Sequence, residues 1–514
     1  MPACPAMFAS ERVHPIVTSV PSPDILPVDS PTAIAWRTVR TLRKVLRNSL
    51  LSVTISWLFA FCCSIGDVFS GLTPCEQSFE EFLVAKMLWF HCFFCIATVS
   101  IYVSLLRTEQ LTDKFKDRLP LIHWVRRLAR LTSPYCVVVA LAVVGGCIGL
   151  SRIPGQNYRS KTSVYFTHIC FYAFVGYTEV QARHLFRTET VRGQARTLQQ
   201  LMRREQRKLS NPSINPALAR KRRFLRVIVQ DLPLIASALF ATAYVHVVSS
   251  IKITTQLYLT LFAMSSIIVK LGLQELAKSF LSKKTRTPNM RTMAIIVAAP
   301  TILVDTQLRT VLLCQDNASM TVVGSLLLAA AEIVIRLGKT AYVRWAEHRI
   351  LTRRSLSSAL IVAEATWATK ISKLDGPRHR TTSSLRIVDP IQDRVHRLLS
   401  LHAAEIYSDM HAEYIAMGCS YGILFFFGAH PKYQLADYEN NVSGRITAVH
   451  WTNASITGLQ LGIEIIVDFV ACALEIRRGI DFEQLNRDDS FLAVFVIAVS
   501  LVNVHISSGM YLSS

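Results

Sequence analysis

The chain has 514 residues, of which 51% are hydrophobic and only 18% are charged, and its formal net charge is +21. Soluble domains average about 25% charged residues, so the chain is more apolar than an ordinary soluble protein. The apolar fraction and the modest counts of 20 Gly and 19 Pro exclude a collagen-like, a coiled-coil and a disordered chain. The apolar residues gather in long blocks, as in membrane-spanning helices. We therefore predict an all-α, polytopic integral membrane protein with about 11 transmembrane helices, in a range of about 10 to 12.

The first residues, 1–33, contain seven prolines and no long apolar run. They are predicted to form a disordered cytosolic tail and not a cleavable signal peptide, because the apolar core of a signal peptide is missing. Residues 34–49 then place Trp36, Val39, Leu42 and Leu46 at helical spacing among five basic residues. This pattern predicts an amphipathic helix that lies in the interface of an anionic leaflet.

The remaining apolar blocks are each about 17 to 25 residues long, enough to cross roughly 30 Å of hydrocarbon as a helix. The predicted spans are Leu50–Leu72, Phe82–Leu106, Thr132–Leu150, Ser163–Glu179, Val229–Ser250, Gln256–Ala277, Thr292–Leu313, Met320–Arg336, Ala412–His430, Ser455–Glu475 and Ser490–Leu512.

Two long basic connections divide the predicted spans into blocks of four, four and three. The predicted divisions are a first transmembrane block at 50–179, a basic cytosolic connection at 180–228, a second block at 229–336, a second basic connection at 337–411 and a third block at 412–514. This division is compatible with an internal duplication, as in many transporters, or with coincidence.

The distribution of basic residues predicts the orientation. Of the 56 Lys and Arg residues, 46 fall in the N-terminal tail and the even-numbered connections, whereas six fall in the odd-numbered connections. Cytosolic loops carry the excess of Lys and Arg, so the N-terminus is predicted to be cytosolic. The net positive charge then marks the cytosolic face, and no nucleic-acid partner is needed to explain it.

The loops also suggest contacts outside the bilayer core. The cluster Arg220, Lys221, Arg222 and Arg223 is a candidate for contact with anionic lipid headgroups, although it could serve only as an orientation signal. Asn441 begins an Asn-Val-Ser sequon in a far-side loop and is the candidate glycosylation site. Both features suit a glycoprotein of the plasma membrane or of a secretory-pathway endomembrane.

The tenth span carries the candidate functional residues. Glu464 and Asp468 are four residues apart, so they share one helix face near the middle of the membrane. Two such carboxylates cannot both ionise cheaply there, so the pair is expected to keep a proton or to bind a cation. His91, at similar depth in the second span, is the candidate partner. Alternatively, the acids only contact neighbouring helices, or pair with Lys86 or Lys270.

These residues favour a secondary transporter or channel-like protein for a small solute or ion. One alternative is a membrane-embedded lipid-modifying transferase with a loop histidine such as His450 as its base, and another is a non-catalytic scaffold whose cytosolic loops bind lipid. No nucleotide-binding, metalloprotease or hydrolase motif occurs in the sequence, so an enzyme is the less favoured class and no cofactor or metal is expected.

Overall fold

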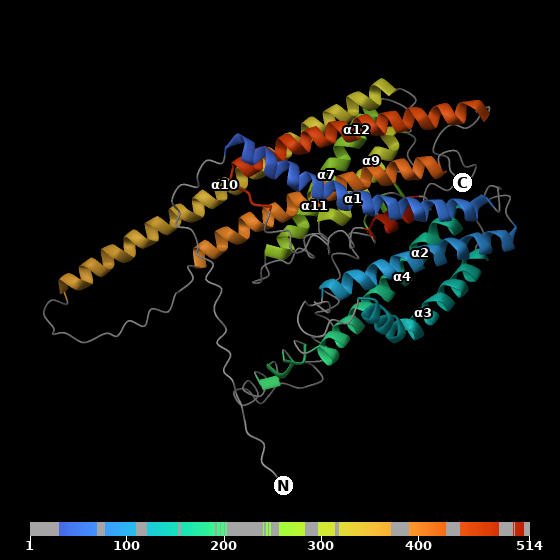
Figure 1. Cartoon of the computed structure of the whole chain (residues 1–514), viewed down its shortest axis with the longest axis horizontal. Helices are drawn as coiled ribbons and strands as arrows, with labels where there is room; N and C mark the ends of the chain where they lie inside the picture. The colour runs from blue at the N-terminus through green and yellow to red at the C-terminus, as the bar shows by residue number, and fades with distance from the viewer. Residues whose placement is uncertain are drawn as a thin grey trace, which may run out of the picture.

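The computed structural model describes residues 30–68, 78–108, 121–152, 156–190, 256–282, 297–313, 318–371, 390–427, 443–482 and 497–507, with a few positions between 193 and 247 and without 498. Apart from a few turn and end residues, these residues are helical, and none of them forms a strand. The predicted all-α class is therefore confirmed. Figure 1 shows a bundle of long helices, most of them running along its longest axis.

Helix α1 spans Pro31–Val68 without a break. Ser30 caps it, since its hydroxyl accepts a bond from the Ala33 amide at 3.3 Å, and Pro31 suits the first helical position. The structure thus joins the predicted interfacial segment 34–49 and the first predicted span in a single helix. No proline or glycine separates the two segments, so nothing in the sequence ends the helix between them.

Helices α2 (Phe79–Thr108), α3 (Leu121–Ser151) and α4 (Gln156–Glu189) pack against one another, and α1 contacts α2. Aromatic rings fill their shared core, with Phe93 and Phe171 centred 4.8 Å apart. Gly146 is needed in α3, because a Cβ there would lie 2.1 Å from the Phe166 ring.

The second group comprises α7 (Gln256–Ser282), α9 (Ala299–Leu313), α10 (Ala318–Ile371), α11 (Pro390–Phe427) and α12 (Ser443–Arg477). Helix α11 lies at its centre and contacts α1, α9, α10 and α12. The packing therefore crosses the boundaries of the sequence blocks, because α1 of the first block packs on α11 of the third.

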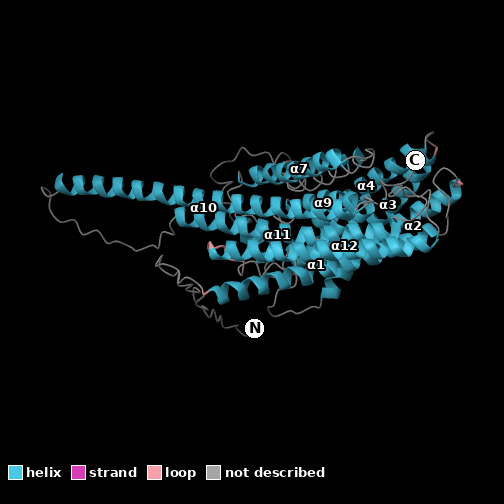
Figure 2. Cartoon of the chain, turned by 90° about the horizontal axis from the view of Figure 1, so that it is seen from above, coloured by secondary structure: helices cyan, strands magenta, loops and turns pink. Residues whose placement is uncertain are grey.

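Two of these helices extend well beyond the predicted spans. Helix α10 continues past Arg336 to Ile371, and its C-terminal part projects from the bundle (Figures 1 and 2). Helix α11 begins at Pro390, 22 residues before the predicted start at Ala412. Much of the predicted connection 337–411 is thus helical.

Helix α12 ends at a glycine C-cap. Gly479 has a φ of +78°, which a residue with a Cβ adopts at a cost. The amide of Ile480 then donates to the carbonyl of Glu475 at 3.1 Å and satisfies an end carbonyl of the helix. This cap fixes the end of the helix directly beside Glu475, a buried acid of the site described below.

The described helices expose apolar side chains on the outside of the bundle and bury charged ones inside it. Leu50, Leu141, Ile268, Val334 and Ile466 are each at least 65% exposed. Among the described residues, two helical segments, Pro31–Cys62 and Leu121–Leu150, are long and apolar enough to cross a membrane.

Candidate functional site: a charged core between five helices

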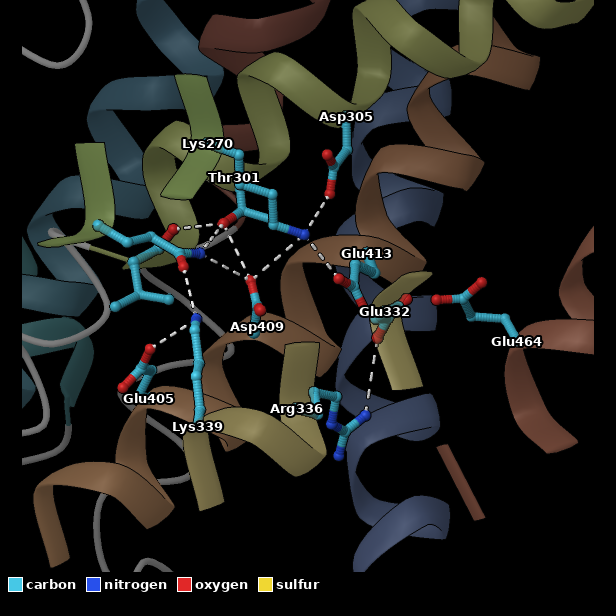
Figure 3. Close-up of polar contacts among 12 residues, drawn as sticks. Lys270, Thr301, Asp305, Glu332, Arg336, Lys339, Glu405, Asp409, Glu413 and Glu464 are labelled. Carbon is cyan, nitrogen blue, oxygen red and sulfur yellow. Dashed lines mark hydrogen bonds and ion pairs between the residues drawn. The ribbon is translucent and has the colours of Figure 1, made fainter. Parts of the chain in front are cut away.

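A group of charged side chains lies inside the bundle, between α7, α9, α10, α11 and α12 (Figure 3). We call this group the charged core, and its members are carboxyl groups and the Lys and Arg side chains within 4.0 Å of them; His402 lies at its edge, with Nδ1 3.9 Å from Oε2 of Glu405. The basic members are Lys270, Arg309, Arg336 and Lys339, and the acidic members are Asp305, Glu332, Glu405, Asp409, Glu413, Glu464, Asp468 and Glu475.

Lys270 of α7 joins three acids from two neighbouring helices. Its Nζ lies 2.9 Å from Oδ2 of Asp305, 2.7 Å from Oε1 of Glu413 and 3.6 Å from Oδ1 of Asp409. The ammonium can donate to three acceptors, so this single cation links α7, α9 and α11.

Arg336 of α10, like Lys270, contacts three acids, and we call these two residues the branch points. Its guanidinium binds Glu475 of α12 through two nitrogens, at 3.2 and 3.3 Å, and it also donates to Asp468. Both of these acids have fully buried side chains. Glu332, one turn earlier on the same helix, lies 3.7 Å from the guanidinium. The planar donor fork of arginine suits such a two-nitrogen contact with a carboxylate.

The other contacts extend the charged core in both directions. Lys339 donates to Glu405 at 3.0 Å and to the amide oxygen of Gln274 at 3.1 Å. The amide nitrogen of Gln274 in turn donates to Asp409 at 3.1 Å. At the opposite end, Arg309 pairs with Glu464 at 3.5 Å.

The charge of this core is not balanced, because eight carboxyl groups face four basic groups in the part of the chain that the structure describes. An ion transferred from water to a low-dielectric interior loses several kcal/mol of hydration, which an opposite charge must offset. If all eight acids were ionised, the core would carry four uncompensated negative charges. The balance therefore requires protons or cations in addition to the four basic side chains.

Glu464 and Asp468 of α12 both belong to this core, as the sequence pattern suggested, but they have different partners. Glu464 lies beside Arg309, and Asp468 lies beside Arg336. The alternative pairing with Lys270 is not seen, since its ion pairs are with other acids, and the side chain of Lys86 lies outside the described residues.

The structure does not bring His91 to these acids, and this part of the prediction is wrong. The His91 side chain is exposed on α2, and its Nδ1 contacts the carbonyl of Met87 in the same helix at 2.6 Å. A similar predicted depth does not place two residues together, because α2 packs mainly against α1, α3 and α4.

Sequence reasoning missed the acids of α11 and the roles of two arginines. Glu405, Asp409 and Glu413 repeat every four residues, the same signal that singled out Glu464 and Asp468. They were overlooked because they lie at or before the start of the predicted ninth span. Arg309 and Arg336 lie near the ends of predicted spans, where long basic side chains can reach the membrane surface, but both are buried.

Between Asp305 and Arg309, α9 also makes neutral polar contacts with residues 503 and 507 near the end of the chain. Asn503 donates to Thr306 at 2.6 Å, and Gln307 donates to Ser507. The ring of His505 stacks on Phe93 at 4.5 Å and thus reaches the aromatic core of the first group.

Two predicted sites cannot be placed. The basic cluster Arg220–Arg223 and the sequon residue Asn441 lie outside the described residues, so lipid contact and glycosylation remain predictions. His450 is in the first part of α12, and its side chain is not among those described. No known protein family, curated protein or solved structure matches this chain.

Proposed function

We propose that this chain is a multi-pass membrane protein that moves protons or small cations through the charged core. The observation that carries the proposal is a set of eight acids, six of them buried and two partly buried, that face four bases inside a bundle with apolar outer surfaces. A soluble fold gains stability by the opposite arrangement, with apolar side chains inside and charges in water. Ionisable groups within a membrane are costly and mark ion or substrate pathways.

The orientation expected from the loop charges tells which end of the charged core faces the cytosol. With a cytosolic N-terminus, α12 runs from the far side back to the cytosol, so Glu475 lies near the cytosolic end and Glu464 deeper. The eleven intervening steps correspond to about 16 Å of helix, roughly half of the hydrocarbon thickness. Thr306 and Gln307, whose neutral contacts join α9 to residues 503 and 507, lie between Asp305 and Arg309 on α9 and so within the depth of the charged core.

The two branch points supply a physical means of moving protons or cations along the charged core. Lys270 and Arg336 each contact three acids, and those acids come from four helices in all. When one acid takes up a proton or cation, its basic partner can strengthen its contacts with the other two. Such an exchange passes charge along the core without leaving a bare charge in the low-dielectric interior.

Flux across vesicles tests the proposal. The full chain is reconstituted with an internal pH-sensitive dye, and a potassium gradient with valinomycin sets the membrane potential. Proton uptake above that of empty vesicles is expected, or sodium uptake in the matching assay, and Glu464→Gln should reduce it. Glu347→Gln is the control, because in the described structure this acid of α10 pairs with Arg344, three residues earlier on the same helix, and lies outside the charged core. Flux equal to empty vesicles for both ions would refute the proposal.

A further inference from the structure

Three acids from three different helices converge within the charged core. Glu332 of α10, Glu413 of α11 and Asp468 of α12 each place one carboxyl oxygen within 4.8 Å of the other two. Asp468 and Glu413 are almost completely buried, and Glu332 is partly buried. We call these three residues the carboxylate triad.

Two basic side chains, Lys270 and Arg336, are neighbours of the triad. Lys270 binds Oε1 of Glu413, and Arg336 binds Oδ1 of Asp468. No well-directed hydrogen bond from a described residue reaches Oε2 of Glu413, Oδ2 of Asp468 or Oε1 of Glu332. The nearest polar neighbours are the Tyr414 hydroxyl beside Asp468 and the Arg336 guanidinium, 3.7 Å from Oε1 of Glu332. Each acid of the triad therefore has one oxygen that forms no hydrogen bond in the described structure and that a ligand can contact.

A fourth acid independently points to the same place. Glu464 is 96% buried, and its Oε1 also lacks a hydrogen-bond partner in the described structure. Figure 3 shows its carboxyl group directed at Glu332 across the space between α12 and α10. Buried polar atoms without a partner are rare in folded proteins, and one explanation for such an atom is an ion that occupies the site.

We propose that the carboxylate triad, with Glu464 as a fourth ligand, binds a hard divalent cation of the Ca²⁺ or Mn²⁺ kind. Such ions prefer carboxylate oxygens, and Ca²⁺–oxygen distances of about 2.3 to 2.6 Å place ligands on opposite sides of the ion up to roughly 5 Å apart. One divalent ion removes half of the four uncompensated negative charges of the core. Protons on the remaining acids remove the rest.

This assignment deepens the proposed function and rests on it for the role of the ion in transport. The binding itself can be measured without transport. Purified full-length protein in detergent is stripped with EDTA, exchanged into metal-free buffer near pH 7 and titrated with Mn²⁺. Electron paramagnetic resonance follows the loss of the free-ion signal, and Ca²⁺ is then added as competitor.

The wild type is expected to bind one Mn²⁺ that Ca²⁺ displaces. Glu413→Gln and Asp468→Asn keep the shape of the side chain and should each weaken binding at least about tenfold, because the affinity of such sites follows the charge of the ligands. Glu347→Gln removes the same charge from α10 outside the triad and should bind as the wild type does. Unchanged circular dichroism and a single size-exclusion peak establish that the variants are folded.

Three results would overturn the metal assignment: no Mn²⁺ binding by the wild type, equal binding by the triad variants, or equal loss in Glu347→Gln. If Mn²⁺ does not bind but vesicles still take up protons or sodium, the metal site is refuted and the proposed function stands. If Mn²⁺ binds as expected but no ion crosses the vesicle membrane, the site stands and transport is refuted.

Discussion

Arg336 is the residue whose loss should disturb the charged core most. Its guanidinium is the only ion-pair partner of Glu475 and Asp468 in the described structure, and both acids have 0% side-chain exposure. Removing one partner of a buried ion pair costs about 3 to 5 kcal/mol, because the other charge stays buried without compensation. Arg336→Gln leaves two such acids, so we expect a loss of stability at the upper end of this range.

The pH dependence of this loss follows from the sign of the charge that is left behind. The uncompensated groups are acids, and protonation removes their charge. Low pH supplies that proton, so the loss of stability of Arg336→Gln relative to the wild type should be larger at pH 8 than at pH 5. Unfolding in sodium dodecyl sulphate, followed by circular dichroism at both pH values, measures the two differences.

A double-mutant cycle measures the interaction energy between Arg336 and Asp468. Asp468→Asn in the Arg336→Gln background should recover part of the lost stability, with a coupling energy of about 0.5 to 3 kcal/mol for residues in contact. Arg344→Gln is the control on the same helix, because its pair with Glu347 is 32% exposed on the arginine side and should be worth about 1 kcal/mol or less. Equal deficits for the two arginine variants, or a deficit independent of pH, would refute the reasoning.

Two further predictions concern packing and topology. Gly418→Ala should destabilise the fold by about 1 to 3 kcal/mol, because a Cβ there would lie 2.4 Å from Val53 on α1, whereas Gly458→Ala, with open space around it, should change the melting temperature little. Equal melting shifts for the two glycine variants would contradict the tight α1–α11 contact. In sealed cells, a membrane-impermeant thiol reagent should label Asn440→Cys and not Ser210→Cys, and labelling at position 210 would overturn the predicted orientation.

The positions of most helices could be predicted from the sequence, but their ends could not be predicted equally well. Most predicted spans overlap a described helix, because apolar blocks of this length have few other structures open to them. The hydropathy pattern fails where charges are buried. Glu405 and Asp409 make the first half of α11 resemble a polar loop, although Lys270, Lys339 and Gln274 satisfy them inside the bundle.

Only part of the candidate site could be predicted from the sequence. Spacing along one helix showed that Glu464 and Asp468 share a face, since that depends only on helix geometry. Their partners depend on which helices touch, and local patterns contain no such information. The prediction of His91 as a partner rests on depth alone, and α2 packs mainly against α1, α3 and α4. Arg309 of α9 and Arg336 of α10 instead reach the acids of α12.

The most direct test of the account is whether the charged core holds exchangeable protons or cations. Purified wild-type protein and Glu464→Gln are melted in detergent from about pH 5 to 9, the range over which a buried carboxyl group would titrate, with monovalent and divalent cations varied. The account predicts that the melting temperature of the wild type changes with pH or with a cation, and that Glu464→Gln folds but responds less. If the two proteins melt alike at every pH and in every cation, the acids serve packing alone and the central claim fails.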